Sequence, residues 1–512
     1  RLVSNKSDGI LIKGGDAGIG CFCQSTWRNN MLFCMKKHGR RLASMICTAA
    51  CTMAMVSAFN VSAYVPYRSF HYISYQSEER QVECPAPFLI DKVVKLGLSS
   101  PGDICVGADR KLYLADTGNS RILVLNADGI VLEEISSFTA DGEKQNFQKP
   151  EGVFADQNGN LYVADTENNR VVVLTESRQW VKNITVEEND VFGEGYVFYP
   201  RKLAVDSAGR LFVVARGQVN GIMQFTPEGN FSSFVGSNRV VTTPFDMIWR
   251  QLMTKEQREK TVQFIPLEYS NLYMDDGDFI YAVTQATDET KKVKRLNPGG
   301  TDILPEAENM AQITEDSQIT CICADQNGNF YYADQASGCV YVFQSDGNLL
   351  YAFGGKEDLQ GNFKSPSAIC YYNDKLYVLD SLSNTLTVFS MADYAKSIQQ
   401  AGQYYRSGEY DKSLALYKNV LKYDSGFDLA YIYMGRIYYQ KEDYQTAMEY
   451  FRKGNYRGDD VIIGYGKALE QYQGEWMRKN LHVLLPCLVI LVLLAVGLIT
   501  WLGKRTKRKA GK

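Results

Sequence analysis

A strand–Asp–loop–Arg–strand pattern recurs six times, about fifty residues apart, and constrains the fold more than any other feature. In the copy LYVADTENNRVVVL, Leu161–Leu174, two apolar strands flank a short polar loop, which is a hairpin pattern. Asp116 and Asp165 are 49 residues apart, and Asp334 and Asp380 are 46 apart. The remaining copies begin at Leu112, Leu211, Phe279, Phe330 and Leu376. Because a single four-stranded sheet cannot bury its faces alone, this period predicts one β-propeller blade per copy.

The six blades are expected to close into a mainly β ring over residues 92–390. Pro101, Pro150, Pro200 and Pro366 open blades, and Pro is acceptable there because the first residue of a strand need not donate a hydrogen bond. The last blade lacks an outer strand, and Phe88–Gly97 ends like the outer strands of other blades. We therefore expect residues 88–97 to complete blade six and remove its open edge.

Both ends of the chain carry targeting or membrane signals. Residues 1–34 are interpreted as a leader or upstream sequence and residues 35–63 as a signal peptide, with an uncleaved anchor helix as the alternative. Residues 64–91 form an N-terminal segment. Residues 481–502 contain no charged side chain and predict one transmembrane helix, followed by a basic cytoplasmic tail at 503–512. This places the bulk of the chain outside the cytoplasm, in a single-pass protein of the cell membrane.

Charge argues against a nucleic-acid partner. Residues 1–63 and 504–512 each carry a net charge of +6, and the whole chain carries −3, so the intervening part carries −15. Nucleic acid requires a basic face that releases counterions, so none is expected as a partner.

The cysteines and histidines limit the chemistry expected of the ring. Cys105, Cys323 and Cys370 fall at one repeated inner-strand position, where Cys acts as a small hydrophobic residue, whereas the disulfide state of Cys84, Cys321 and Cys339 stays open. His38, His71 and His482 all fall outside residues 92–390, which argues against a His-bound zinc site and an imidazole base in the ring. We expect no enzyme and no cofactor. A calcium site of carboxylates and carbonyls stays open.

Two copies of the pattern carry a family resemblance. DTGNSR at Asp116–Arg121 and DTENNR at Asp165–Arg170 follow LYxAD strands and resemble the NHL repeat. Blades three to six depart from it, with Ala215, Cys339 and Thr385 at positions of the Asp or Arg. We interpret Asp116 with Arg121, and Asp165 with Arg170, as structural pairs. An insertion in blade four, between Thr243 and Tyr269, predicts a helix.

Residues 391–475 change to a helical period. GEYDKS at Gly408–Ser413 is echoed by EDYQTA at Glu442–Ala447, 34 residues later, and Tyr417 is echoed by Phe451. This helix-pair repeat resembles the tetratricopeptide repeat (TPR), which implies a peptide- or protein-binding surface. A simple stalk between ring and membrane is the alternative.

Polar loops and strand ends are expected to gather at one mouth of the ring's channel, in a patch that suits a saccharide, a peptide or a protein loop. The candidate ligand- or partner-binding residues are Asp103, Asp116, Asn119, Glu151, Asn168, Asn169, Arg201, Arg216 and Gln335. No catalytic or metal-binding residue is assigned.

The order of segments resembles membrane-anchored NHL-repeat proteins of Gram-positive bacteria that are associated with ABC transporters. The resemblance implies an extracytoplasmic binding or scaffold protein whose partner is a transport permease or another envelope protein. One alternative is a calcium-dependent enzyme of the lactonase or lyase propeller type. Another is an extracellular sensor that acts through membrane partners.

Overall fold

The computed structural model describes most of the chain after residue 64. It covers residues 65–75, 78–186, 191–193, 195–237, 268–284, 292–304, 316–454 and 458–510. The leader and signal peptide expected at 1–63, and the helix expected in the blade-four insertion, lie outside the described residues. Val65–Lys512 forms a compact unit of its own.

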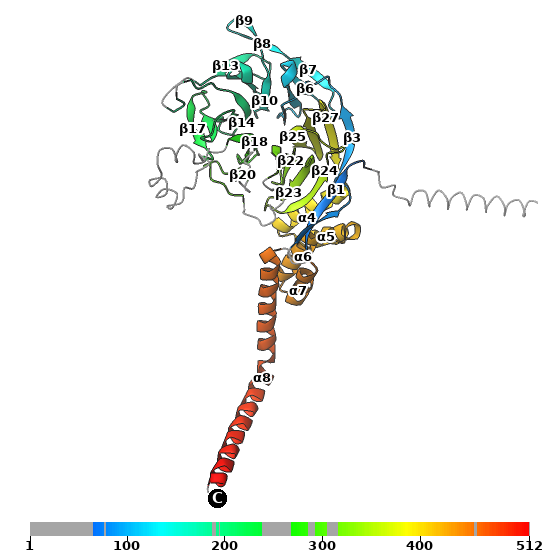
Figure 1. Cartoon of the computed structure of the whole chain (residues 1–512), viewed down its shortest axis with the longest axis vertical. Helices are drawn as coiled ribbons and strands as arrows, with labels where there is room; N and C mark the ends of the chain where they lie inside the picture. The colour runs from blue at the N-terminus through cyan, green and yellow to red at the C-terminus, as the bar shows by residue number, and fades with distance from the viewer. Residues whose placement is uncertain are drawn as a thin grey trace, which may run out of the picture. The chain divides into compact units, whose positions relative to one another are not determined.

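Six antiparallel sheets are arranged around a common axis as a β-propeller (Figure 1). Blades one to three consist of β4 (Asp103–Val106), β5 (Leu112–Asp116), β6 (Arg121–Leu125) and β7 (Val131–Ile135); β10 (Pro150–Ala155), β11 (Leu161–Asp165), β12 (Arg170–Leu174) and β13 (Trp180–Ile184); and β14 (Pro200–Val205), β15 (Leu211–Ala215), β16 (Ile222–Phe225) and β17 (Phe231–Val235). Blades four to six consist of β18 (Tyr269–Met274), β19 (Ile280–Thr284) and β20 (Val293–Leu296); β21 (Ile319–Ala324), β22 (Phe330–Asp334), β23 (Cys339–Phe343) and β24 (Leu349–Gly354); and β25 (Pro366–Tyr372), β26 (Lys375–Asp380), β27 (Thr385–Met391) and β3 (Phe88–Val94). The first strand of each blade is the inner one, beside the axis.

The ring closes both at its axis and at its outer edge. Each inner strand contacts the inner strands of the two neighbouring blades, and β25 of blade six contacts β4 of blade one. The outer strand of blade six is β3, which pairs antiparallel with β27 and places Val93 opposite Thr387. The N-terminal segment from which closure was expected therefore fills this place.

The turn after each inner strand follows from its sequence. In blade two, Asp156 Oδ1 accepts hydrogen bonds from the backbone N–H groups of Asn158 at 2.9 Å and Asn160 at 2.8 Å. Gly159 has φ +81°, a conformation that favours glycine. Asp206, Asp275 and Asp325 form the same turn in blades three, four and five. These carboxylates therefore lie at one end of the inner strands.

Apolar side chains fill the space between adjacent blades. Separate buried clusters lie between blades one and two, two and three, three and four, four and five, and six and one. The cluster between blades five and six continues into the helices that follow the ring. Each blade therefore buries apolar surface against its neighbours, and this burial favours the closed ring.

Two hairpins were not predicted from the sequence. β1 (Arg68–Tyr75) and β2 (Glu78–Glu83) extend blade five, because β1 pairs with the outer strand β24. β8 (Ser137–Ala140) and β9 (Glu143–Asn146) form a hairpin between blades one and two. Neither hairpin has a counterpart in the repeat.

Five helices follow the ring: α4 (Asp393–Arg406), α5 (Tyr410–Tyr423), α6 (Asp428–Gln440), α7 (Tyr444–Lys453) and α8 (Gly458–Ala510). α5 and α7 begin 34 residues apart, as the sequence echo requires. α4 packs against α5, α6 against α7, and α7 against the start of α8. The region is thus two helical hairpins and a long final helix.

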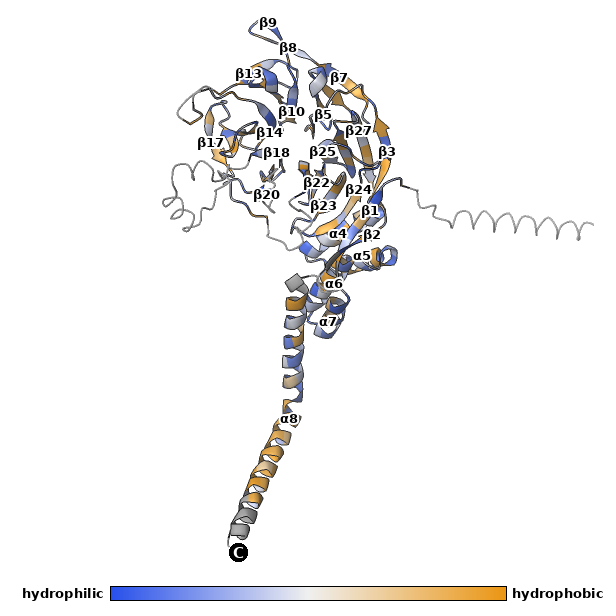
Figure 2. Ribbon diagram, viewed as in Figure 1, coloured by the Kyte–Doolittle hydropathy of each residue, from blue (hydrophilic) through white to orange (hydrophobic). Residues whose placement is uncertain are grey.

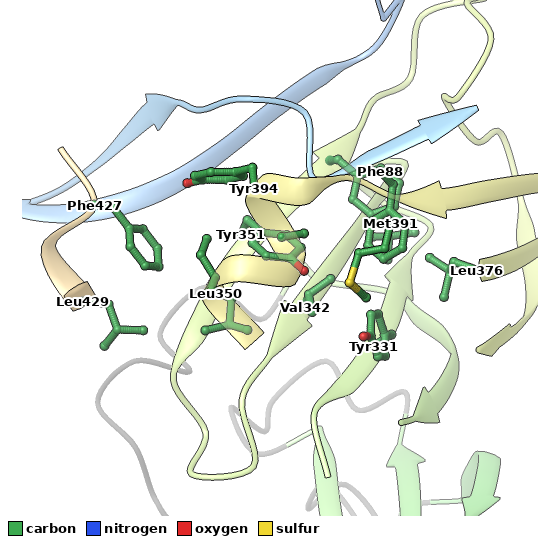
Figure 3. Packing of buried hydrophobic residues seen from close by; sticks show 14 of the residues in the cluster. Phe88, Tyr331, Val342, Leu350, Tyr351, Leu376, Met391, Tyr394, Phe427 and Leu429 are labelled. Atoms are coloured by element: carbon green, nitrogen blue, oxygen red, sulfur yellow. The ribbon is translucent and has the colours of Figure 1, made fainter. Parts of the chain in front are cut away.

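Helix α4 connects the ring to these hairpins. Figure 3 shows Tyr394 of α4 near Phe427, with Phe88, Met391 and Tyr351 in the same cluster. Gln399 Nε2 donates hydrogen bonds to the hydroxyls of Tyr331 at 2.9 Å and Tyr351 at 3.1 Å. The helices are therefore packed directly on blades five and six.

Helix α8 is long and apolar enough to cross a membrane over Ile462–Leu502, and it is the single such helix in the described part of the chain. Figure 2 shows the hydrophobic colour concentrated in its later part. Leu491 is 63% exposed and Leu494 is 65% exposed. The span expected at residues 481–502 lies inside this helix.

Candidate functional site: the channel of the ring

The six inner strands enclose a channel whose lining differs between blades. Two residues after the opening position of each inner strand, alignment of the repeats places a different side chain in each blade. These residues are Asp103, Gly152, Lys202, Asn271, Cys321 and Ala368. The six blades therefore share one backbone architecture, but each presents a different side chain at this position of the channel.

Cavities lie at the two ends of the inner strands. The first, here called the small cup, has a volume of about 330 Å³ and is lined by Glu151, Arg201, Gln335 and several hydroxyl-bearing residues. The second, here called the large cavity, has a volume of about 1120 Å³ and reaches the turns that carry Asp156 and Asp325. The small cup lies at the end where the ligand-binding patch was expected, but the larger space lies at the other end.

Two charged residues that line the small cup, Glu151 and Arg201, form a cluster with Arg216, which is not one of its lining residues. Glu151 accepts a hydrogen bond from Arg201 Nε at 2.8 Å and another from Arg216 Nη2 at 2.5 Å. The Arg216 guanidinium also lies over the ring of Tyr199, 5.6 Å from its centre. Three predicted residues thus come together, with a net positive charge and with Arg216 47% exposed.

Other predicted residues hold the loops together. Arg121 Nε lies 2.7 Å from Asp116 Oδ2, and Arg170 Nε lies 2.9 Å from Asp165 Oδ2. Asp116, whose side chain is fully buried, also accepts hydrogen bonds from the N–H of Ser99 and from Asn119. These contacts tie the strand end to the loop before the blade, so Asp116 is not available to a ligand.

The asparagines in these loops are used in a similar way. Asn119 Nδ2 donates to the carbonyl of Gly97 at 2.9 Å, and Asn168 Nδ2 donates to the carbonyl of Asn146 at 3.1 Å. Asn169 has φ +55° and ends a short 3₁₀ turn. The structure therefore gives these three residues local roles in the loops.

Asp103 lies inside the channel in an ion pair that the sequence did not predict. Lys202 Nζ is 2.7 Å from Asp103 Oδ1 and also donates to the carbonyl of Gly102 at 2.7 Å. Asp103 Oδ2 accepts a hydrogen bond from the N–H of Val153 at 3.1 Å. Because Lys202 lines the small cup and Asp103 lines the large cavity, this ion pair separates the two.

Aromatic and thiol side chains line the large cavity. Burial raises the pKa of Tyr273 well above its ordinary value, so its hydroxyl remains a neutral donor. Burial raises the pKa of Cys321 and of Cys370 to about 12, so these thiols stay protonated. All seven cysteines of the described residues are free thiols, including Cys84 and Cys339.

In the described part of the chain, no three His, Cys, Asp or Glu side chains come together as a group that could hold a metal ion. His71 lies on β1, outside the residue range of the ring but in the sheet that extends blade five, and its Nε2 is 3.0 Å from Asp424 Oδ2. His71 does not line either cavity.

Sequence reasoning missed Lys202 and Tyr273 because their roles depend on partners and neighbours from other blades. The repeat pattern did contain one usable signal: the Asp of each inner turn recurs in blades two to five. Those carboxylates line the large cavity. Their shared position in the repeat therefore predicts a group of carboxylates at this end of the channel.

Comparison with known proteins identifies the repeat but not the activity. Residues 98–125 and 147–174 match the NHL repeat family. No curated protein matches the chain by sequence.

Similar solved structures include virginiamycin B lyase from Staphylococcus aureus, with 13% identity, a TM-score of 0.38, and 60% of this chain and 100% of that chain covered. A putative gluconolactonase has 13% identity and a TM-score of 0.37, with 60% and 93% covered. A protein of unknown function from Bacteroides thetaiotaomicron has 13% identity and a TM-score of 0.38, with 64% and 91% covered. The chain contains NHL repeats in a six-bladed β-propeller, followed by a helical region with one candidate membrane span.

Proposed function

We propose that this chain is a membrane-anchored binding protein in which the ring holds a ligand and the helical hairpins contact a protein partner. The observation that carries the proposal is a closed ring with a cavity of about 1120 Å³, packed against helices that lead into an exposed apolar helix of membrane-spanning length. A cavity of this size accommodates a small molecule or a short peptide.

The proposed orientation places the ring outside the cytoplasm. Six Lys or Arg residues follow the apolar helix within residues 504–512, whereas residues 64–503 carry a net charge of −15. Basic residues next to a span favour the cytoplasmic side. The ring would then meet ligands outside the cell membrane.

The proposed partner is a permease of an ABC-type transport system or another envelope protein. The two hairpins α4–α5 and α6–α7 repeat at 34 residues and are similar in this respect to TPR units, which bind peptides or proteins. Their link to α8 would hold a bound partner at the membrane surface.

The anchor is tested by charges placed in the apolar helix. Leu491→Lys with Leu494→Lys should release the full chain from membranes, because each charge at the centre of a bilayer costs about 3 kcal/mol. The control adds the same charges earlier in the helix, through Gln471→Lys with Gln473→Lys. Equal membrane retention of both variants after carbonate extraction would contradict the anchor.

The orientation is tested by introduced cysteines and a membrane-impermeant maleimide, with labelling compared with that of the parent chain, whose own free thiols include Cys84 and Cys105. Asp141→Cys, in the exposed turn of the β8–β9 hairpin, should react in intact cells. Ala510→Cys should react only after permeabilisation. The opposite pattern would place the ring in the cytoplasm.

The partner is tested by crosslinking in membranes and mass spectrometry of the purified full chain. Recovery of a permease or another envelope protein supports the proposal, and its absence under efficient crosslinking contradicts it. Stoichiometric calcium together with lactone turnover by the purified chain would instead favour a propeller enzyme.

A further inference from the structure

The large cavity has an uneven balance of charge. Eight aspartates and two arginines line it. Cations of the chain pair with four of these aspartates: Lys202 with Asp103, Arg210 with Asp206, Arg295 with Asp275, and Lys396 with Asp374. Arg110 adds one more positive charge to the rim. The cavity therefore keeps a net charge of −3.

The other four aspartates have no cationic partner among the described residues, and two of them are well buried. Asp156 is 8% exposed and Asp325 is 6% exposed. Their oxygens accept hydrogen bonds from their own turns and from the neutral side chains of Asn160 and Asn329, and Asp325 also accepts one from the Tyr331 hydroxyl. Asp276 and Asp278 lie on the turn between β18 and β19. These hydrogen bonds compensate part of the cost of burying the two carboxylates, and a cationic ligand would compensate more of it.

The position of these carboxylates restricts the shape of a ligand. Asp156 is in blade two and Asp325 is in blade five, on opposite sides of a six-bladed ring. A single small cation cannot contact both sides of a cavity of about 1120 Å³. An extended molecule with several amines along its chain can contact both sides.

The remaining walls suit the aliphatic part of such a ligand. Phe154, Tyr273 and Tyr371 line the cavity together with neutral thiols. Aromatic faces attract organic cations, and they also pack against methylene groups. The Tyr273 hydroxyl makes no hydrogen bond to any other residue that the structure describes, so it can donate to or accept from a ligand.

We propose that the large cavity binds an aliphatic polyamine, with protonated amines at the carboxylates of blades two, four and five and methylene groups against the aromatic wall. The inference rests on the proposed ligand-binding role of the ring and names the ligand class of that role. It assigns binding to the end of the channel opposite the small cup. The ion pair between Lys202 and Asp103 closes the far end of the site.

Binding is measured by isothermal titration calorimetry of the full chain in a non-ionic detergent, with spermine as the probe. One-to-one binding that weakens as salt is raised from 50 to 300 mM is expected, because exposed charge attraction is screened. Tetra-acetylated spermine, which has the same chain without the positive charges, should not bind.

Three variants locate the site. Asp325→Asn and Asp156→Asn should each weaken spermine binding about tenfold, because each removes a charge close to the ligand in a medium of intermediate dielectric constant. Asp276→Asn, in an exposed turn position, should weaken it about threefold without a risk to folding. Asp141→Asn makes the same charge change outside the cavity and is the matched control.

The outcomes separate this inference from the proposed function. No spermine binding, or equal loss in Asp141→Asn and Asp276→Asn, overturns the polyamine site. Membrane anchoring, orientation and partner recovery are measured independently and can stand in that case. Selective loss in the three cavity variants, with unchanged melting temperature for Asp276→Asn, supports the site.

Discussion

Replacement of Lys202 by methionine removes the cation that crosses the channel of the ring. Lys202 and Asp103 are 10% and 16% exposed, and the substitution leaves the Asp103 carboxylate and the Gly102 carbonyl without their 2.7 Å donor. Loss of one partner of a buried ion pair typically costs 3–5 kcal/mol. Asp103 retains the Val153 N–H and lies beside a large cavity that water can enter. We therefore expect a loss of about 2–3 kcal/mol in the free energy of unfolding.

Guanidinium unfolding of the full chain, followed by near-ultraviolet circular dichroism of the ring tyrosines, measures this loss. Lys202→Met with Asp103→Leu should recover most of it, because no unpaired charge remains. Lys92→Met is the control: its ion pair with Asp128 is exposed, so a change below about 0.5 kcal/mol is expected. A single Lys202→Met variant as stable as the parent, or a double variant that loses the sum of both single losses, would refute the reasoning.

Three further predictions concern packing, loop structure and pH. Gly152→Ala should lower stability by about 3 kcal/mol in thermal unfolding, because the new Cβ would clash with the Arg201 carbonyl oxygen. The control Gly466→Ala lies in open space on α8 and should not lower the stability. Asp165→Ala should increase protease cleavage of the loop around Gln148, whose N–H loses its 2.6 Å acceptor; a cleavage rate equal to that of the parent would contradict this. Burial raises the pKa of Asp424, but hydrogen bonds from His71 and Tyr394 outweigh it, so the pKa lies below its ordinary value of 3.8. A carboxylate with a lowered folded-state pKa contributes stability above pH 4, and this contribution is lost as the pH falls further. In a pH series of unfolding curves, the stability difference between the parent and Asp424→Asn should therefore shrink below pH 4. A constant difference would contradict the role of this carboxylate.

The fold could be read from the sequence where it depends on local repetition. The strand–Asp–loop–Arg–strand pattern specifies both a hairpin and its register, since Asp116 pairs with Arg121 across β5 and β6. The outer strand β3 was also recognisable, because Phe88–Gly97 ends like the outer strands of other blades. The hairpin β1–β2 was not, because it has no counterpart in the repeat and its partner β24 is more than 280 residues away in the chain.

The candidate site was less predictable because it depends on contacts between blades. The sequence named Glu151, Arg201 and Arg216 among its candidates, and in the structure Glu151 accepts hydrogen bonds from both arginines beside the small cup. It also placed Asp103 near the channel mouth, but its partner Lys202 is 99 residues away and no local pattern connects them. The sequence does not distinguish a charged side chain that is exposed to a ligand from one that pairs with a residue of another blade.

The closure of the ring by its N-terminal strand is tested most directly by a disulfide across blade six. Val93 and Thr387 lie opposite each other on β3 and β27, at a separation typical of paired strands that a disulfide can span. Val93→Cys with Thr387→Cys should form an intramolecular disulfide, identified as a linked peptide by mass spectrometry, and Ser233→Cys in blade three with Thr387→Cys should not. Two free thiols in the first variant, or a link in the second, would contradict a closed six-bladed ring.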